Sequence, residues 1–388
     1  MRNHGGLLTP GADLADGSSG SNSQPPLRAH RLLTASTACT ETPRARPAAL
    51  MTYERRNRSE ENLELKITTM SPQFSFSTEG SDVVRALKTE VKGKTFLVTG
   101  PTPGSIGAET AATLATGAPA CIILVGRSLS SAQATIDRIK TTDSNVNVKF
   151  FEADLSSVEA VRSAADSILA SADIPVIHAM INNAGIMVPP YSLTTDGFES
   201  QFAINHLSHF LLTNKLMPKL LAAGSARVVN VSSIGNCYSG INWDDVQFSS
   251  GYTPQKAYGQ SKTAQILFTV ALNKRYGSRG IRSFALDPGS VQTGLAKHIT
   301  PEIAADMALK ITGKSLAEAR AARRKTVPQG CATSLVAALD PTLEGGIFLV
   351  DCRISSGPNI VAPWSLDEAA ADRCWSLSEG LVGETFTA

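Results

Sequence analysis

The sequence has no apolar run long enough to cross a lipid bilayer. Its longest runs, such as residues 120–125, are much shorter than the roughly 20 residues that a spanning helix needs. An excess of charge of one sign is also missing, since the formal net charge is +2 and no extended run of Lys and Arg occurs. These absences argue against a membrane-spanning protein and against an electrostatic surface for nucleic acid or anionic lipid.

Paired cysteines are absent as well. The six cysteines are scattered, and none belongs to a CxxC pair. Several stand in apolar stretches, where a thiol usually acts as a small hydrophobic side chain. We therefore expect a reducing compartment and a cytoplasmic protein without a metal site, because the pair His206 and His209 has no evident third ligand. The cysteines are Cys39, Cys121, Cys237, Cys331, Cys352 and Cys374.

Residues 1–80 differ in composition from the rest of the chain. They are rich in Gly, Ser, Pro, Thr and Arg and show neither the period of about 3.6 of a helix nor that of a strand. We expect this extension to be disordered. Its scattered arginines leave an organelle transit peptide open, and a third interpretation places the true start at Met70. Residues 81–388 are expected to form a single domain.

The pattern changes from about residue 91 onward. Short apolar runs rich in β-branched residues alternate with amphipathic stretches of about a dozen residues or more, which is typical of βαβ units. Continuous apolar runs indicate strands buried on both faces. This predicts an α/β domain with three α/β/α layers around a doubly wound (Rossmann) parallel sheet. The seven predicted strands are residues 95–99, 120–125, 148–152, 176–181, 227–231, 281–286 and 347–350.

A glycine-rich turn follows the first predicted strand and leads into a helix-like segment. Glycines there let backbone N–H groups approach a pyrophosphate, and the N-terminus of the helix adds partial positive charge. An ordinary strand-to-helix turn also uses glycine. The turn reads GPTPGSIG, and its predicted cofactor-binding residues are Gly100, Gly104, Ile106 and Gly107.

The end of the second predicted strand bears on which dinucleotide binds. It carries no Asp or Glu, the residue with which such folds hold the free 2′-hydroxyl of NAD. NADP(H) is therefore the predicted cofactor, with the guanidinium of Arg127 pairing with its 2′-phosphate and Ser128 assisting. A solvated arginine that caps a helix is the alternative.

Tyr258 and Lys262 lie four residues apart in a segment with helical periodicity, which puts both side chains on one helix face. A phenol with its pKa of about 10 is a poor base at neutral pH, but a neighbouring ammonium moves that pKa towards the working range. The pair therefore predicts proton transfer.

Three motifs occur in order along the chain: a TGxxxGxG-like turn, the tetrapeptide NNAG and YxxxK. Together they resemble the short-chain dehydrogenase/reductase family over about residues 93–383, although the glycine turn is one residue longer than the family pattern. The resemblance implies that Ser233, with Ser232 as the alternative, binds the substrate oxygen beside Tyr258. It also implies that Asn205, in a long helix, holds a water linking Lys262 to solvent, and that Lys262 and Tyr258 border the bound cofactor.

The same resemblance implies further contacts to the cofactor. The pair Asp154 and Leu155 would flank the adenine ring, although Asp154 fits a helix N-cap equally well. Asn183 of the NNAG turn would back the cofactor. Val291 and Thr293, in a PGxVxT-like turn, would face the nicotinamide carboxamide.

An insertion at residues 234–257 and the C-terminal pattern are similar to the retinol-dehydrogenase-like and WW-domain-oxidoreductase-like branch. Residues 294–326 are expected to form a lid, whose Ala-rich and Leu-rich stretches favour an apolar substrate such as a polyketide, terpenoid or lipid-derived compound. The basic residues at 320 and 323–325 are expected to form a solvated face.

We therefore predict an NADP(H)-dependent oxidoreductase that acts on a secondary alcohol, ketone or aldehyde. The alternative is a catalytically silent NADP(H)-binding regulatory or scaffold protein. The resemblance to the family is also compatible with a homo-oligomer.

Overall fold

Residues 73–321 and 324–387 are described by a computed structural model, with the backbone alone described at 319–321. The interpretations given to residues 1–72 therefore lie outside the described residues. Residues 73–79, which the sequence assigns to the extension, contact the domain. Phe74 is buried, and its carbonyl accepts a hydrogen bond from Arg353 Nε at 2.9 Å.

The described residues form one eight-stranded sheet in the order β3-β2-β1-β4-β5-β6-β7-β8. Strands β1 to β7 run parallel, which confirms the predicted Rossmann fold, whereas the two-residue β8 pairs antiparallel with β7. The sequence missed β8 because its residues are exposed and form no apolar run. The strands are β1 (Thr95–Thr99), β2 (Cys121–Gly126), β3 (Asn147–Glu152), β4 (Ala179–Asn182), β5 (Ala226–Val231), β6 (Ile281–Asp287), β7 (Ile347–Val350) and β8 (Arg353–Ile354).

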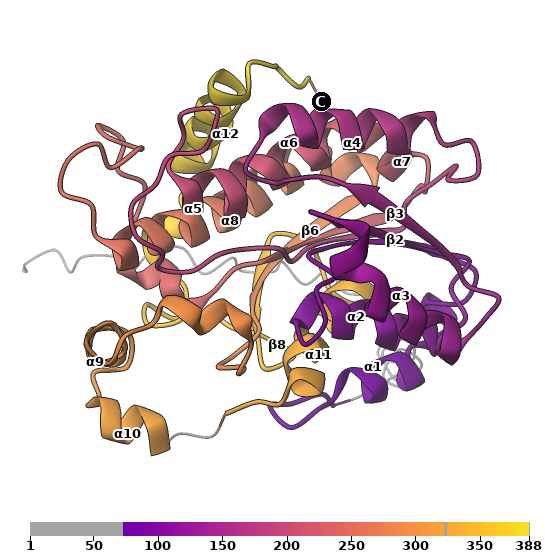
Figure 1. The fold of residues 1–388 in the computed structure, drawn as a ribbon, viewed down its shortest axis with the longest axis horizontal. Coiled ribbons are helices and arrows are strands. Elements are labelled where there is room, and N and C mark those ends of the chain that lie inside the picture. The colour runs from indigo at the N-terminus through magenta and orange to yellow at the C-terminus, as the bar shows by residue number, and fades with distance from the viewer. Residues whose placement is uncertain (1–72, 322–323, 388) are drawn as a thin grey trace, which may run out of the picture. The chain divides into compact units, whose positions relative to one another are not determined.

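Helices cover both faces of the sheet (Figure 1). One face carries α1 (Gly80–Ala86), α2 (Ile106–Ala115), α3 (Leu129–Thr142) and α11 (Val327–Leu339). The other carries α4 (Val158–Ala170), α5 (Ser200–Phe202), α6 (Ser208–Lys215), α7 (Met217–Leu221), α8 (Pro254–Tyr276) and α12 (Glu368–Val382). Two further helices, α9 (Pro301–Thr312) and α10 (Leu316–Ala321), lie outside these layers. No helix within the described ranges is both long and apolar enough to span a membrane.

The central strands are buried along their whole length, as a sheet covered on both faces requires. Every residue of β1, β4 and β5 is buried. Because their side chains alternate between the faces, each strand contributes to two apolar cores. One core includes Phe96 and α11, and the other includes Phe210 and α8.

The carboxyl ends of the neighbouring strands β1, β4, β5 and β6 meet at one edge of the sheet. Thr99, Asn182, Val231 and Asp287 end these four strands. In an open α/β sheet this edge is where ligands bind.

Candidate active site

Tyr258 and Lys262 lie side by side on α8. Both are almost fully buried, with 3% and 4% of their surface exposed, and Lys262 Nζ lies 5.5 Å from the centre of the Tyr258 ring. The ammonium donates to the carbonyl of Val231, the last residue of β5, at 3.0 Å. The helix thus holds both groups against the carboxyl edge of the sheet.

The two serines that follow β5 have different partners. Ser232 is buried and donates its hydroxyl to the carbonyl of Lys262 at 2.8 Å, so it joins β5 to α8. Ser233 and Tyr258 border the same point, since a Cβ on Gly235 would lie 3.3 Å from Ser233 Oγ and 2.8 Å from Tyr258 Cε1. Ser233 also caps a 3₁₀ helix (Ile234–Tyr238) by accepting from the Gly235 N–H at 3.0 Å. The geometry therefore brings Ser233, not Ser232, to the phenol.

Burial dominates the ionisation of the pair. It raises the pKa of Tyr258 well above its usual range, against the lowering effect of Ser233. The lowering by Lys262 that the spacing predicts does not prevail, since burial also lowers the pKa of Lys262 to about 7. The phenol is therefore protonated at neutral pH.

Asn205 does not lie in a regular long helix, as the sequence predicts. It belongs to a π-helical turn (Ala203–Leu207) between α5 and α6, a feature that often marks functional sites. Its side chain is fully buried, accepts from the Ile186 N–H at 2.8 Å, and donates to Ser261 Oγ at 2.9 Å. In this structure Asn205 therefore joins the loop after β4 to α8.

His209 takes part in a network that the sequence analysis missed. Its Nδ1 lies 3.0 Å from the Asn205 carbonyl, which only accepts, so Nδ1 carries the proton. Its Nε2 then accepts from the Thr99 hydroxyl at 2.9 Å. Thr99 Oγ1 also accepts from the N–H groups of Asn183 and Ala184. The signal in the sequence is the spacing of four between Asn205 and His209, which puts them on adjacent helical turns.

No metal site is found within the described ranges, where no group of three or more His, Cys, Asp or Glu could hold an ion. His206 contacts Ser378 on α12 instead, with Nε2 2.8 Å from the Ser378 hydroxyl.

Asp287 is a second residue that the sequence analysis left without a role. Its carboxylate is buried and accepts from the N–H groups of Ile234 at 3.1 Å and Gly289 at 2.9 Å. It therefore joins the loop after Ser233 to the Pro-Gly turn after β6. Its negative charge raises the pKa of both Tyr258 and Lys262.

The prediction of a solvated basic face is wrong at Lys325 and right at Arg324, which is exposed, whereas the side chains of Arg320 and Arg323 lie outside the described residues. The Lys325 side chain has no exposed surface, and its Nζ lies 2.7 Å from Asp351 Oδ1. Its aliphatic stem lies against Gly289, where a Cβ would come within 2.9 Å of Lys325 Cδ. An ion pair and close packing thus bury a lysine that stands in a basic stretch of the sequence.

The glycine turn between β1 and α2 accommodates its additional residue through two left-handed glycines, with φ of +73° at Gly100 and +77° at Gly104. The Ser105 N–H donates to the Thr102 carbonyl at 3.0 Å, and the Ser105 hydroxyl donates to the Gly100 carbonyl at 3.0 Å. Ser105 also caps α2 by accepting from the Ala108 N–H. These contacts close the longer turn.

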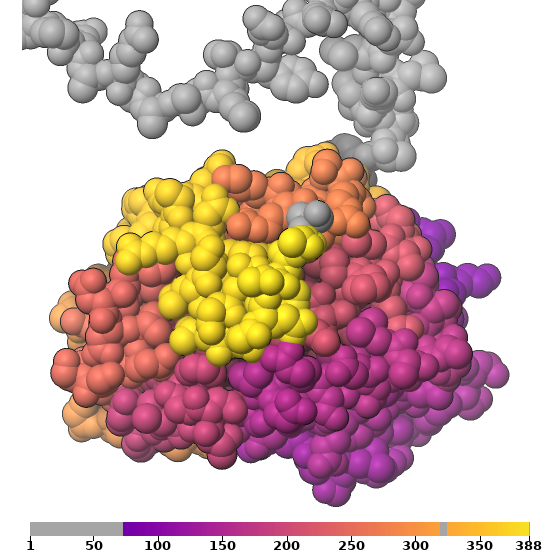
Figure 2. Space-filling view, turned by 90° about the horizontal axis from the view of Figure 1, so that it is seen from above, coloured from indigo at the N-terminus to yellow at the C-terminus, as the bar shows by residue number. Residues whose placement is uncertain are grey.

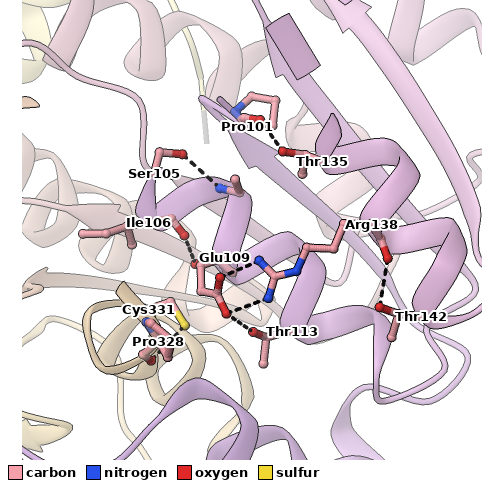
Figure 3. Close-up of polar contacts among 12 residues, drawn as sticks. Pro101, Ser105, Ile106, Glu109, Thr113, Thr135, Arg138, Thr142, Pro328 and Cys331 are labelled. Atoms are coloured by element: carbon pink, nitrogen blue, oxygen red, sulfur yellow. Dashed lines mark hydrogen bonds and ion pairs between the residues drawn. The ribbon is translucent and has the colours of Figure 1, made fainter. Parts of the chain in front are cut away.

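Helix α3 supports the turn from the side (Figure 3). Thr135 donates to the Pro101 carbonyl at 2.9 Å. Arg138 forms two hydrogen bonds with the Glu109 carboxylate, at 2.6 and 3.0 Å, and so joins α3 to α2. The turn is therefore held by two helices as well as by its own prolines.

The turn suits a dinucleotide pyrophosphate. Four N–H groups in and after it donate to no acceptor in the part of the chain that the structure describes, and backbone donors at a helix N-terminus favour phosphate. A Cβ on Gly104 would meet no atom within 4 Å, so the backbone is open to a ligand at that point. The donors belong to Thr102, Gly104, Ile106 and Gly107.

The residues predicted to contact the adenosine end lie beyond β2 and β3. Arg127 is exposed, directly after β2, and Ser128 rather than Arg127 caps α3. Asp154 accepts from the backbone and hydroxyl of Ser156. The alternative N-cap role for Asp154 is wrong, because Ser157 caps α4. Leu155, by contrast, is buried in the core.

The remaining predicted cofactor residues lie at β4 and after β6. Asn183 donates to the Thr99 carbonyl at 2.9 Å, which ties the NNAG turn to β1. Val291 pairs with Lys325 in an isolated bridge. Thr293 caps a 3₁₀ helix (Gly294–His298) that begins the predicted lid.

Helix α9 of this predicted lid contacts α8 and the 3₁₀ helix that follows Ser233. Its Asp306 accepts from Gln255, in the first turn of α8, at 3.2 Å. Its Lys310 lies 5.9 Å from the ring centre of Tyr238, whose hydroxyl is buried without a hydrogen-bond partner among the described residues. The segment thus contains a regular helix of 12 residues.

Comparison with known proteins identifies the family. The sequence matches the family model described as short chain dehydrogenase over residues 94–304. The chain is a short-chain dehydrogenase/reductase. The matched range includes the glycine turn, Ser233, Tyr258 and Lys262.

Relatives of this short-chain dehydrogenase/reductase cover most of its domain. Short-chain dehydrogenase/reductase prx1 of Penicillium roqueforti is 38% identical over 302 residues, which are 74% of this chain and 84% of that protein. Retinol dehydrogenase 12 of Homo sapiens is 34% identical, covering 76% of this chain and 88% of that protein. The crystal structure of an uncharacterized Mycobacterium paratuberculosis protein is 30% identical with a TM-score of 0.58, covering 76% of this chain and 96% of that one. These matches support the predicted family and its retinol-dehydrogenase-like branch.

Proposed function

We propose that this short-chain dehydrogenase/reductase is an NADP(H)-dependent enzyme that interconverts an apolar secondary alcohol with its ketone, or an alcohol with its aldehyde. The juxtaposition of Ser233 and Tyr258 around Gly235, beside Lys262 at the carboxyl edge of the sheet, is the observation that carries the proposal. Two neighbouring hydroxyls suit a carbonyl oxygen, which accepts two hydrogen bonds.

In the reducing direction, Ser233 and Tyr258 donate hydrogen bonds to the substrate oxygen, and Tyr258 then transfers its proton to that oxygen. Lys262 stabilises the phenolate that remains, through its charge 5.5 Å from the ring centre. The nicotinamide supplies the hydride when it is bound, and accepts it in the oxidising direction. The tether from Asn205 to Ser261 holds the loop after β4 near this proton path.

The preference for NADP(H) is supported by Arg127, an exposed arginine directly after β2. No acidic residue stands at the end of this strand to favour the free 2′-hydroxyl of NAD. A planar guanidinium matches a phosphate with two hydrogen bonds.

An apolar substrate is supported by the segment expected to form the lid. Leu295 and Leu309 are exposed on its first 3₁₀ helix and on α9, at 38% and 62%. The relative named retinol dehydrogenase 12 supports the same class, because retinol is an apolar alcohol.

The replacement Tyr258→Phe tests this proposal. It removes only the hydroxyl, so the NADPH affinity should be retained while turnover of a responsive carbonyl compound falls by about 100-fold or more. Turnover is followed by NADPH absorbance over a panel of apolar ketones and aldehydes, and affinity by NADPH fluorescence.

Tyr276→Phe is the matched control for this experiment. Tyr276 is also buried on α8, but its hydroxyl contacts the Thr387 carbonyl at the far end of the helix. Its loss should leave turnover near the wild-type value. Near-normal activity of Tyr258→Phe would refute the role of Tyr258.

A further inference from the structure

Gln265 forms a hydrogen bond with Lys262 and has no role in the proposed function. It lies three residues after Lys262 on α8, with only 1% of its surface exposed. Its Oε1 accepts a hydrogen bond from Lys262 Nζ at 2.9 Å. Since an ammonium only donates, the amide must present its oxygen to this partner.

Among the described residues, Gln265 supplies the side-chain acceptor for this ammonium. The other acceptor is the Val231 carbonyl at 3.0 Å. Asn205, the polar side chain expected to serve Lys262, has both ends of its amide engaged with Ile186 and Ser261. Two of the three N–H groups of Lys262 are thus held, and one remains to act elsewhere.

The contact between Gln265 and Lys262 comes at a cost in free energy at the other end of the Gln265 amide, Nε2. Gln265 Nε2 is buried and has no hydrogen-bond partner within the described ranges. An unpaired buried amide group is unfavourable, and an apolar side chain of similar size would avoid it. The oxygen bonded to Lys262 is therefore the part of this side chain with an evident use.

We propose that Gln265 is a positioning residue that holds the Lys262 ammonium charged and directed at Tyr258 and the bound cofactor. This inference rests on the proposed function, because it assumes that Lys262 serves Tyr258. The amide oxygen compensates in part for the water that the ammonium loses on burial.

The other ionisable groups facing Lys262 come from three elements. Asp287 at the end of β6 raises the pKa of Lys262, against burial, which lowers it to about 7. His209 of α6 is neutral, because burial lowers its pKa to about 4, and Tyr258 lies on α8 itself. Removing the neutral acceptor should lower the pKa of Lys262 further, whereas a carboxylate in its place should raise it.

The test compares the isosteric Gln265→Glu with Gln265→Leu in the full-length enzyme. We expect the alkaline limb of the turnover profile, measured with NADPH, to move to lower pH in Gln265→Leu and to higher pH in Gln265→Glu, by about one unit each. Turnover of Gln265→Leu at its optimum should fall about 10-fold, and its NADPH affinity should also weaken. A merely structural role would not move the two variants in opposite directions.

Gln260→Leu is the matched control. Gln260 is a second fully buried glutamine of α8, but its amide contacts Asn242 and Val246 of the insertion. It should lower stability without moving the alkaline limb.

The inference would be overturned if the alkaline limb moved in the same direction in both Gln265 variants, or if it stayed at the wild-type pH in Gln265→Glu. Gln265→Glu decides the matter if Gln265→Leu does not fold. Tyr258→Phe is assayed in parallel. If the proposed function is wrong, this variant keeps its activity. If only the inference about Gln265 is wrong, Tyr258→Phe is still inactive.

Discussion

Arg127 stands directly after β2 and does not cap the helix that follows. It is exposed, and the cap of the following helix is formed by Ser128. The alternative prediction, a capping arginine, therefore loses its support. The proposed recognition of a 2′-phosphate would give this exposed arginine a role.

Arg127→Ala is expected to raise the KM for NADPH by about 10-fold or more and to leave that for NADH nearly unchanged, because only NADPH carries the 2′-phosphate. Initial rates with both cofactors measure this, and NADH serves as the control within each preparation. Equal wild-type rates with the two cofactors would contradict the assignment.

Lys325 shows the limit of sequence reasoning at the scale of one residue. It stands in a basic stretch, and such a stretch usually indicates a solvated face. Its burial depends on Asp351, in the turn between β7 and β8, and on the absence of a side chain at Gly289. Neither partner is near Lys325 in sequence, so the local sequence pattern cannot predict these contacts.

At the scale of elements, the glycine turn illustrates two different uses of glycine. Gly107 lies in α2, where a Cβ would come within 2.4 Å of Asn183 Nδ2 and 2.6 Å of the Gly100 carbonyl oxygen. It allows the helix to approach the strand ends. Gly104 has open space around it but a φ of +77°, which side chains rarely adopt.

We expect Gly107→Ala to lower the free energy of unfolding by about 3 kcal/mol through overpacking, and Gly104→Ala by about 1 kcal/mol through backbone strain. Gly107→Ala should also weaken NADPH binding, because it displaces the N-terminus of α2. Urea unfolding and NADPH titration measure both effects. Equal losses of stability in the two variants would argue against the close approach at Gly107.

The π-helical turn at Asn205 could not be predicted from the apolar pattern. Residues 202–221 have the apolar content of a continuous helix, and one wider turn changes that pattern little. The turn is recognised by its backbone, in which the Ser208 N–H donates to the carbonyl of Ala203, five residues earlier. Propensity did supply a hint, since Asn is unfavourable within a helix.

At the scale of the whole molecule, α12 covers the outer face of α8. Trp375 packs edge-on against Phe210 at 5.0 Å, and Arg275 lies 4.4 Å from its ring centre. Asp372 pairs with Arg275 at 2.8 Å. Figure 2 shows the yellow C-terminal segment at the centre of this face, with earlier segments around it.

Two histidines beneath this face make stability depend on pH. Burial lowers the pKa of His206 to about 3 and that of His209 to about 4, from 6.5 in the unfolded chain. Below pH 6.5 the unfolded state therefore binds more protons, and stability falls as the pH decreases towards the folded values. Between pH 7.5 and pH 5 we expect a loss of about 2 kcal/mol for each histidine, measured by urea unfolding.

His206→Gln should lose about 2 kcal/mol less than the wild type between the two pH values, because one titrating group is gone. Ser378→Ala is the control, since it removes the hydroxyl that contacts His206 and leaves the imidazole buried. It should lower stability at both pH values and keep the wild-type dependence. An unchanged pH dependence in His206→Gln would show that other groups are responsible.

The sequence alone determined the family, the parallel doubly wound sheet and the approximate positions of its seven main strands. Apolar runs and strand-to-helix turns are local patterns, and burial on both faces follows directly from them. The YxxxK spacing likewise brought Tyr258 and Lys262 together without further information. Only the tertiary structure decided the partners of these residues.

Hydrogen bonds and ion pairs join side chains that are distant in sequence, and their geometry depends on how the layers pack. Such contacts give Ser232 and Ser233 different partners. They also hold the buried carboxylate of Asp287 and form the network through His209. Burial also reversed the expected shift of the Tyr258 pKa, because the cost of charging a buried phenol outweighs a neighbouring lysine that is itself desolvated.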